Sequence, residues 1–298
     1  MSGVEIIKVK SIDDGMRLNR WFLKYYPSLS LGRLQKLLRT KQIKVDGKKA
    51  EANLRIFTGQ EIRLPPLDNE KAQQNTSIIP DKYAELIRTM VIFKNNDIIV
   101  LNKPAGLAVQ GGSGLTQHID GMLGALKYEY EEDPRLVHRI DKETSGILVL
   151  ARTRQFADKL TKAFREHKLP KTYLAITHNI PPKDEGKITL PIEEKSAQTV
   201  YETLDVVGDK FALVKANPLS GRKHQIRIHL HSIACPIIGD KKYFLTPKPF
   251  VPEIKNKLYL HAYKMDLSCL YNKKLEIVAP LPKHFKEALV VLGLNFEG

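Results

Sequence analysis

The sequence predicts an α+β protein with two domains. Its 298 residues are enough for two domains, one of them with a substantial hydrophobic core. Segments with helical spacing of apolar residues occur beside short strand-like runs and turn signals. The charge is unevenly spread, since residues 1–66 carry 14 of the 48 Lys and Arg residues but 6 of the 33 Asp and Glu residues. We therefore expect a basic domain at residues 11–66, a linker at 67–88 and a larger domain at 89–298.

Two helices open the basic domain. Apolar residues recur at helical spacing in residues 18–25, which predicts a helix that Pro27 ends. Ser30 can cap a second helix, whose apolar face lies among residues 31–38. Cations occupy the other face of this second helix and the residues that follow it: Arg33, Lys36, Arg39, Lys41 and Lys44.

Two interpretations of these five cations are open, a solvated helix face and an RNA-binding surface. The acidic residues thin out where the cations cluster, which favours RNA contact. Residues 43–45 alternate into Asp46-Gly47, a strong hairpin signal, and a further strand is expected at residues 61–64. This arrangement of two helices, a basic face and a hairpin resembles the α-L RNA-binding fold shared with a small-subunit ribosomal protein.

The chain then becomes polar and afterwards regains strand character. Residues 67–77 follow two prolines and have little apolar content, which is typical of a linker. Residues 91–101 are strand-like, with an interruption at 95–97 that predicts a hairpin. A short helix is expected at residues 118–126.

Residues 136–151 organise the larger domain. The second part of this stretch, residues 147–151, is an unbroken apolar run that predicts a strand buried on both faces. The first part is charged and polar, so its side chains are expected at the edge of the core, where a pocket can form. Asp141 precedes a Thr-Ser-Gly sequence and is either presented from a tight turn or merely caps that turn.

The remaining chain continues with helices and strands. Helices are expected at residues 156–164, 221–233 and 283–292, and strands at residues 171–176, 200–207 and 210–216.

Residues 138–146, His-Arg-Ile-Asp-Lys-Glu-Thr-Ser-Gly, closely resemble the His-Arg-Leu-Asp-x-x-Thr-Ser-Gly signature of RluA-type pseudouridine synthases. Further segments resemble elements of this family in the same order: residues 102–107, 171–175, 221–229, 236–240 and 260–262. Gln110 and Cys235 stand where the family often has His. The resemblance implies a pseudouridine synthase catalytic domain built on a mixed, mostly antiparallel sheet. The basic front domain places the chain nearest the RluC-like branch, with an RluD-like subgroup left open.

The resemblance implies isomerisation of uridine to pseudouridine in large-subunit ribosomal RNA, free or in assembling particles, without a cofactor. In the family, the residue that matches Asp141 is the nucleophile, and Arg227 corresponds to the cation paired with it. Tyr173 is expected to stack on the uracil and to help remove the proton from carbon 5. Arg139 is expected to fill the space that the flipped uridine leaves, and Arg222 to contact RNA. A carboxylate suits this chemistry because cleavage of the glycosidic bond develops positive charge on the sugar.

Without the resemblance, several of these residues have a simpler interpretation. Tyr173 would be a core aromatic residue, and Arg227 an arginine on a helix surface. His224, His229 and His231 could suggest a metal site, but their spacings of five and two on a helix do not converge on one ion. We therefore expect no metal and assign these histidines to structural or RNA-contacting roles.

Composition limits the class of protein. The net charge of +15 and the sequence pI near 9.6 favour a polyanionic partner, and nucleic acid before membrane, because no basic amphipathic helix dominates the chain. No apolar run approaches the roughly 18 residues of a membrane helix. The N-terminus lacks an apolar signal core, and Cys235 and Cys269 form neither a zinc motif nor a disulfide framework. We expect a cytoplasmic monomer.

Two other functions are considered. A non-catalytic ribosome-assembly factor would bind RNA through the same surfaces, but it has no use for Asp141, Tyr173 and Arg227 together. A ribosomal RNA methyltransferase would need a glycine-rich cofactor loop between a strand and a helix, and the sequence offers none.

Overall fold

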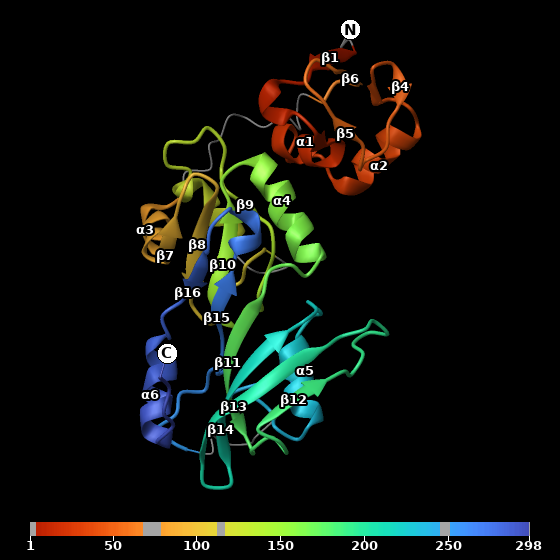
Figure 1. Cartoon of the computed structure of the whole chain (residues 1–298). Coiled ribbons are helices and arrows are strands. Elements are labelled where there is room, and N and C mark those ends of the chain that lie inside the picture. The colour runs from red at the N-terminus through yellow and green to blue at the C-terminus, as the bar shows by residue number, and fades with distance from the viewer. Residues whose placement is uncertain (1–3, 68–78, 112–116, 245–250, 298) are drawn as a thin grey trace. The chain divides into compact units, whose positions relative to one another are not determined.

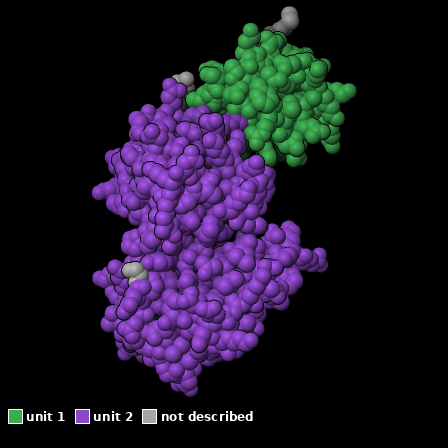
Figure 2. Space-filling view, in the orientation of Figure 1, with its two compact units in different colours: residues 1–78 green, residues 79–298 purple. Residues whose placement is uncertain are grey.

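The structure is a computed structural model that describes residues 4–67, 79–111, 117–244 and 251–297. The chain divides into two compact units, Met1–Ile78 and Ile79–Gly298, which Figure 2 colours separately. The boundary falls inside the segment that was expected to be a linker.

The first unit contains two α-helices and six short strands among its described residues. Its elements are β1 (Glu5–Lys8), the 3₁₀ helix η1 (Ser11–Asp13), β2 (Met16–Arg17), α1 (Leu18–Tyr25), α2 (Leu31–Arg39), β3 (Lys44–Val45), β4 (Lys48–Lys49), β5 (Arg55–Ile56) and β6 (Glu61–Leu64). Four strands form a sheet in the order β1-β6-β3-β4, and β2 pairs with β5. Because β1 pairs with β6, the basic unit begins before residue 11, where the sequence was expected to start it.

Local signals explain the helices and the hairpin of this unit. The Ser30 side chain accepts a hydrogen bond from the backbone N–H of Arg33, so it caps α2 as expected. Asp46 and Gly47 both have positive φ, at 48° and 73°, as a two-residue hairpin between β3 and β4 requires. Trp21 lies at the centre of a small aromatic core in this unit.

Among its described residues, the second unit combines four α-helices with a ten-stranded sheet (Figure 1). Its helices are α3 (Asp81–Thr89), α4 (Arg154–Arg165), α5 (Gln225–Ser232), α6 (Lys283–Leu292) and the 3₁₀ helices η3 (Asp120–Leu126) and η4 (Ser268–Leu270). Its strands are β7 (Val91–Lys94), β8 (Ile98–Lys103), β9 (Arg135–Leu136), β10 (Ser145–Ala151), β11 (Lys171–His178), β12 (Glu185–Ile188), β13 (Thr199–Val207), β14 (Phe211–Pro218), β15 (Leu260–Asp266) and β16 (Glu276–Val278).

The sheet runs β12-β13-β14-β11-β15-β10-β8-β7, with β16 beside β15 and β9 beside β10. All of its described strand pairs are antiparallel except β10 with β15. The α+β class with a mixed, mostly antiparallel sheet is therefore confirmed. Strand β10 is buried throughout, as its apolar sequence predicted. Alternate residues of β10 enter two separate cores, one that includes residues of α4 and one that includes residues of α3 and η3.

One expected boundary is corrected. The linker was expected to reach residue 88, but α3 already begins at Asp81. Ile87 of α3 packs in the core that contains Leu123 and Leu126 of η3, and the Arg88 side chain donates to the Ala125 carbonyl oxygen at 3.2 Å. The buried residues Ala84 and Ile87 of α3 recur at helical spacing, so the sequence does carry a signal for this helix. Residues 68–78 of the expected linker lie outside the described residues.

Candidate active site

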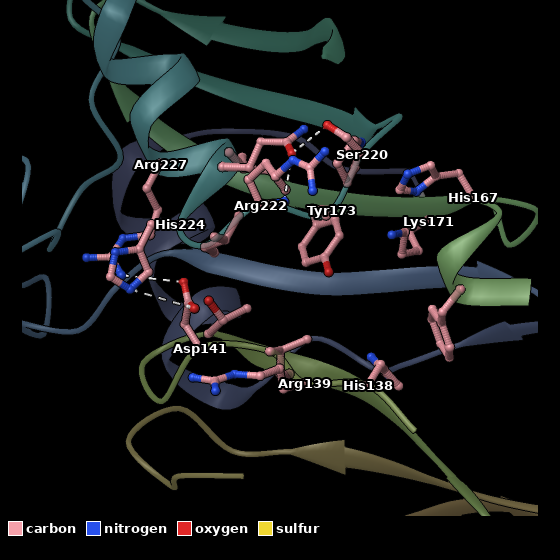
Figure 3. Close-up of a pocket in the computed structure, with 18 of the residues that line it drawn as sticks. His138, Arg139, Asp141, His167, Lys171, Tyr173, Ser220, Arg222, His224 and Arg227 are labelled. Atoms are coloured by element: carbon pink, nitrogen blue, oxygen red, sulfur yellow. Dashed lines mark hydrogen bonds and ion pairs between the residues drawn. The ribbon is translucent and has the colours of Figure 1, made fainter. Parts of the chain in front are cut away.

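A pocket of about 440 Å³ lies in the second unit, where the loop before β10, the end of α4, the start of β11 and the start of α5 meet (Figure 3). Figure 2 shows this unit hollowed on the side where α4 and the strands near α5 face each other. Four residues that the sequence singled out for the chemistry line the pocket together: Arg139, Asp141, Tyr173 and Arg227. The volume is within the range of small-ligand pockets, about 300–1,000 Å³.

A tight turn presents Asp141 to the pocket. The Asp141 carbonyl oxygen accepts a hydrogen bond from the backbone N–H of Thr144, just before β10 begins. The buried Lys103 ammonium fixes the neighbouring backbone, because it donates to the carbonyl oxygens of Lys142, Leu107 and Pro104 at 2.8–3.0 Å. Burial lowers the pKa of Lys103 to about 7, although the charges of Glu143 and Asp141 act in the opposite direction. Lys103 therefore ties the turn that carries the carboxylate to the backbone of residues 104–107.

Close packing of β10 against β15 supports the same turn. Gly146 has a φ of 104°, and a Cβ atom there would lie 2.2 Å from the Ala262 carbonyl oxygen, so only glycine fits. Next to it, the Ser145 hydroxyl lies 2.9 Å from His261 Nδ1, and His261 Nε2 lies 3.2 Å from the Ala279 carbonyl oxygen. Since a carbonyl only accepts, Nε2 carries the proton and Nδ1 accepts from the serine. Burial lowers the pKa of His261 to about 4, so this histidine is neutral and structural.

Two groups face the Asp141 carboxylate, Arg227 of α5 and His224 just before this helix (Figure 3). Arg227 Nη1 donates to Asp141 Oδ2 at 3.5 Å, and His224 Nε2 lies 3.7 Å from Asp141 Oδ1. The Asp141 side chain keeps 23% of its surface exposed, whereas that of Arg227 keeps 8%. His224 Nδ1 is hydrogen-bonded to the Tyr243 hydroxyl at 2.9 Å. The carboxylate is therefore attracted by a cation but not enclosed.

A second carboxylate anchors the arginine. Asp240 accepts two hydrogen bonds from Arg227, from Nε and Nη2, both at 2.7 Å, and also accepts from the backbone N–H groups of Lys242 and Tyr243. Burial alone would raise the pKa of Asp240, but these hydrogen bonds hold it below its ordinary value. Burial alone would likewise lower the pKa of Arg227, and Asp240 raises it instead. Arg227 is thus a buried, oriented cation and not a residue on a helix surface.

Tyr173 stands on β11 with its side chain in the pocket (Figure 3). Burial, and after it the negative charge of Asp141, raise its pKa well above the ordinary value for tyrosine. The hydroxyl is therefore protonated at neutral pH and can donate a hydrogen bond to a bound ligand. Tyr173 therefore lines the pocket and also belongs to the core, because its ring packs against buried residues of the sheet.

His138 and Arg139 have different roles although they are adjacent. His138 Nε2 accepts a hydrogen bond from the backbone N–H of Val149 at 2.8 Å, and its ring stacks on Phe164. Burial, and after it the charge of Lys171, lower the pKa of His138 to about 3, so it supports the structure as a neutral ring. Arg139 is exposed and lines the pocket.

The expected RNA-binding residues fall in both units. Arg33, Lys36, Arg39 and Lys41 are exposed on the first unit, and Lys44 is half-buried there. Arg222 is half-buried at the pocket of the second unit, where its Nε donates to the Ser196 carbonyl oxygen at 3.2 Å.

The three histidines at the start of α5 and within it do not converge, and His231 is exposed. His224 faces Asp141, while His229 is buried and hydrogen-bonded to Thr199 Oγ1 and to the Leu190 carbonyl oxygen. Across the described ranges, no three His, Cys, Asp or Glu residues are grouped so that they could hold a metal ion. No described helix is long and apolar enough to cross a membrane.

The sequence interpretation missed several residues of the site. Asp240 and Lys171 were quoted only as parts of family-like segments, and Lys103 likewise. Nothing in the sequence marked Tyr243 as a partner of His224. The signal that could have found Asp240 is its place at the end of residues 236–240, but the contact with Arg227 depends on the tertiary fold.

Comparisons of the chain with known proteins give a consistent set of relatives. Residues 97–232 match the family model described as RNA pseudouridylate synthase, and this segment contains Asp141, Tyr173 and Arg227. A protein of Rickettsia bellii named "Ribosomal large subunit pseudouridine synthase C" is 38% identical over 293 residues, which cover 90% of this chain and 95% of that protein. "RNA pseudouridine synthase 4, mitochondrial" of Arabidopsis thaliana is 32% identical, over 79% of this chain and 62% of its own. The solved structure "Human RNA Pseudouridylate Synthase Domain Containing 4" has a TM-score of 0.64 and 28% identity, and the match covers 73% of this chain and 98% of that one.

Proposed function

This chain belongs to the RNA pseudouridylate synthase family, and from that membership we propose that it isomerises uridine to pseudouridine in large-subunit ribosomal RNA, with Asp141 as the nucleophile. It is an RNA pseudouridine synthase. The observation that supports the nucleophile most strongly is the partly exposed Asp141 carboxylate, held 3.5 Å from a buried Arg227 in a pocket of about 440 Å³.

The geometry suits attack by an ionised carboxylate. The positive charge of Arg227 lies close to the Asp141 carboxylate and attracts it. The Arg227–Asp141 contact is long, so the carboxylate can move toward a ligand without breaking a short ion pair. Covalent catalysis of this kind divides one difficult displacement into two easier steps.

The target uridine has to leave its helix before it can react. A stacked uridine hides its reacting atoms, and extrusion costs roughly a few kcal/mol, least in loops and mispaired regions. The exposed Arg139 lies at the pocket two residues before Asp141, where it can occupy the position that the uridine vacates.

In the reaction, the bond between ring nitrogen 1 and the sugar breaks, the uracil rotates, and carbon 5 joins the sugar. An Asp141 oxygen bonds either to the sugar or to ring carbon 6 and is released in the final step. The proton lost from carbon 5 is matched by one gained at nitrogen 1, so no atom is lost overall, and no electron donor or acceptor is required. Tyr173 is protonated, so it removes the proton from carbon 5 only if its own proton moves on, for which the Asp141 carboxylate in the same pocket is available.

The basic first unit provides an additional RNA contact through the cations on and after α2. Backbone phosphates bind such residues without regard to sequence, so this unit would add affinity and not choose the uridine. Action in the cytoplasm as a monomer is proposed as well, on the basis of the sequence alone.

The experiment that tests this function is a pseudouridine map of ribosomal RNA from a strain that lacks the gene. Specific large-subunit uridines are expected to lose modification and to regain it with the wild-type gene but not with Asp141→Asn. An unchanged map would disprove the proposal. Full rescue of ribosome assembly and of the map by Asp141→Asn would instead indicate a binding protein.

A further inference from the structure

The pocket contains a half-buried cation that the proposed function does not use. Lys171 is the first residue of β11, two positions before Tyr173, and side chains two apart on a strand share one face. Both line the pocket, whereas Thr172 and Leu174 line a separate cavity of about 500 Å³ on the other face. In Figure 3, Lys171 and Asp141 lie on opposite sides of Tyr173. A base stacked on Tyr173 would therefore have the carboxylate at one end and the ammonium at the other.

No acid neutralises this ammonium. In the described part of the chain, Lys171 Nζ has no ion pair and no hydrogen-bond acceptor, and Asp141 is the only carboxylate among the described residues that line the pocket. His167 and the neutral His138 lie near Lys171 in Figure 3, and Arg165 also lines the pocket, so these residues add positive charge and no negative charge. Burial lowers the pKa of Lys171, which is the cost of a desolvated cation without a partner. Such a cation gains most from an anion that appears in the pocket during the reaction.

The proposed reaction generates such an anion on the uracil. If Asp141 attacks the sugar, the bond between nitrogen 1 and the sugar breaks, and its electron pair remains on the uracil, spread over the two carbonyl oxygens. If Asp141 attacks ring carbon 6, the electron pair of the double bond between carbons 5 and 6 is displaced onto carbon 5 and the oxygen at carbon 4. Both routes place negative charge on a uracil oxygen, and both leave the Lys171 proton where it is.

We propose that Lys171 is a catalytic residue whose ammonium stabilises the negative charge that develops on a uracil carbonyl oxygen. This assignment rests on the proposed function. A preoriented charge in a partly dry site favours the transition state over the ground state, because the neutral uracil of the substrate interacts with it less. If Asp141 attacks the sugar, the ammonium and the carboxylate act on the two halves of the breaking bond, the uracil and the sugar. If Asp141 attacks ring carbon 6, both act on the uracil.

The test compares Lys171→Gln with wild type and with Lys168→Gln. Lys168 is a matched control, because it is an exposed lysine three residues away that pairs with Glu166 and does not line the pocket. On a ribosomal RNA fragment, single-turnover conversion by Lys171→Gln is expected to be roughly 10²–10³-fold slower, while RNA affinity stays close to wild type. Lys168→Gln should convert the fragment at the wild-type rate.

A second substrate carries 5-fluorouridine at the target position. Fluorine stabilises a uracil anion, so the rate defect of Lys171→Gln in consuming 5-fluorouridine should be at least several-fold smaller than its defect with uridine. Consumption is followed by digesting the RNA and separating the nucleosides. Because the comparison is a ratio of two substrates on one variant, partial unfolding of that variant cancels.

Three outcomes would overturn the assignment. Equal rate defects on both substrates would indicate that Lys171 only maintains the structure. Weaker binding with an unchanged rate, together with a flatter salt dependence, would indicate an RNA phosphate as its partner. A wild-type rate in Lys171→Gln would leave Lys171 without a role. If wild type itself makes no pseudouridine in this fragment or in total large-subunit RNA, the proposed function fails, and Lys171 with it.

Discussion

The two sides of Arg227 are built differently, although each faces an aspartate. Toward Asp240 the guanidinium makes two hydrogen bonds of 2.7 Å, and the Asp240 side chain is 1% exposed. Toward Asp141 it makes one contact of 3.5 Å, and that side chain is 23% exposed. One carboxylate therefore fixes the arginine, and the other stays available to a ligand.

The difference also determines the charge of the site. Asp240 neutralises Arg227, so the Asp141 charge is left in excess where positive charge develops on the sugar. A buried ion pair has a large desolvation cost that only good geometry and further hydrogen bonds offset. Asp240 has good geometry, with two hydrogen bonds of 2.7 Å from Arg227, and it accepts further hydrogen bonds from two backbone N–H groups.

The largest expected effect comes from removing the available charge. Asp141→Asn keeps the size of the side chain but not the nucleophilic oxygen, so the single-turnover rate should fall by roughly 10⁴-fold or more. RNA affinity should stay near the wild-type value, since the carboxylate does not attract a polyanion. Both are measured on one RNA, by pseudouridine formation and by filter binding.

Asp240→Asn is the matched control for that variant. It makes the same chemical change on the anchored side and should retain measurable turnover, because Asp141 is still present. Equal loss in the two folded variants would mean that the two carboxylates do not differ in function.

The next largest effect is on stability, and Asp240→Asn should lower the free energy of unfolding by more than Asp141→Asn does. Asp240→Asn leaves the buried Arg227 charge without its main partner, which should cost about 3–5 kcal/mol in the free energy of unfolding. Asp141→Asn should cost much less, since its contact is long and partly exposed. Urea denaturation of the two variants and wild type measures the difference.

The contribution of Asp240 to the free energy of unfolding should decrease as the pH falls into the acid range. Its folded-state pKa lies below the unfolded value, about 3.9, so its charge stabilises the fold above pH 4 and progressively less as the pH falls through the folded value. The difference between wild type and Asp240→Asn should therefore be constant from pH 5 to 7 and shrink below pH 4. A difference that grows toward acid pH would contradict the assigned ion pair.

The sequence predicted those parts of the fold that are determined by residues close together in the chain. The Ser30 cap, the Asp46-Gly47 hairpin and the terminal helix α6 follow from neighbouring residues, and all three are present. Short strands such as β9 and β16 have no signal of their own, because they form only beside longer strands.

The site divides in the same way. Asp141 was identified from a contiguous signature. Asp240 and Lys171 become recognisable as site residues only in the folded protein, where Arg227 lies beside Asp240 and no described acid pairs with Lys171. Arg227 and Asp141 are 86 residues apart in sequence. No pattern of spacing shows that one aspartate binds this arginine tightly and the other loosely, because tertiary packing sets both distances.

A smaller effect on the reaction rate is expected from removing the hydroxyl of Tyr173, which shares the pocket with Asp141. Tyr173→Phe keeps the ring but removes the hydroxyl, so the rate should fall about 10–100-fold, with RNA affinity within about twofold, since the stacking face remains. Tyr263→Phe is the control, because Tyr263 lines the cavity on the other face of the sheet. Equal losses of rate and affinity in Tyr173→Phe would indicate a stacking role alone.

The smallest effect on the chemical step is expected from the first unit, whose charges lie outside the pocket. Replacing Arg33, Lys36 and Arg39 together by Gln should leave the single-turnover rate at saturating RNA unchanged and weaken binding. If all three contact phosphates, the slope of log affinity against log salt should flatten by about 2, from roughly 0.7 per contact on single strands. Replacing Lys10, Lys48 and Arg63, which are exposed in the same unit, removes equal charge from residues outside α2. Equal flattening in both triple variants would mean that the unit attracts RNA by its net charge, and an unchanged slope in the first would mean that the α2 face does not hold RNA.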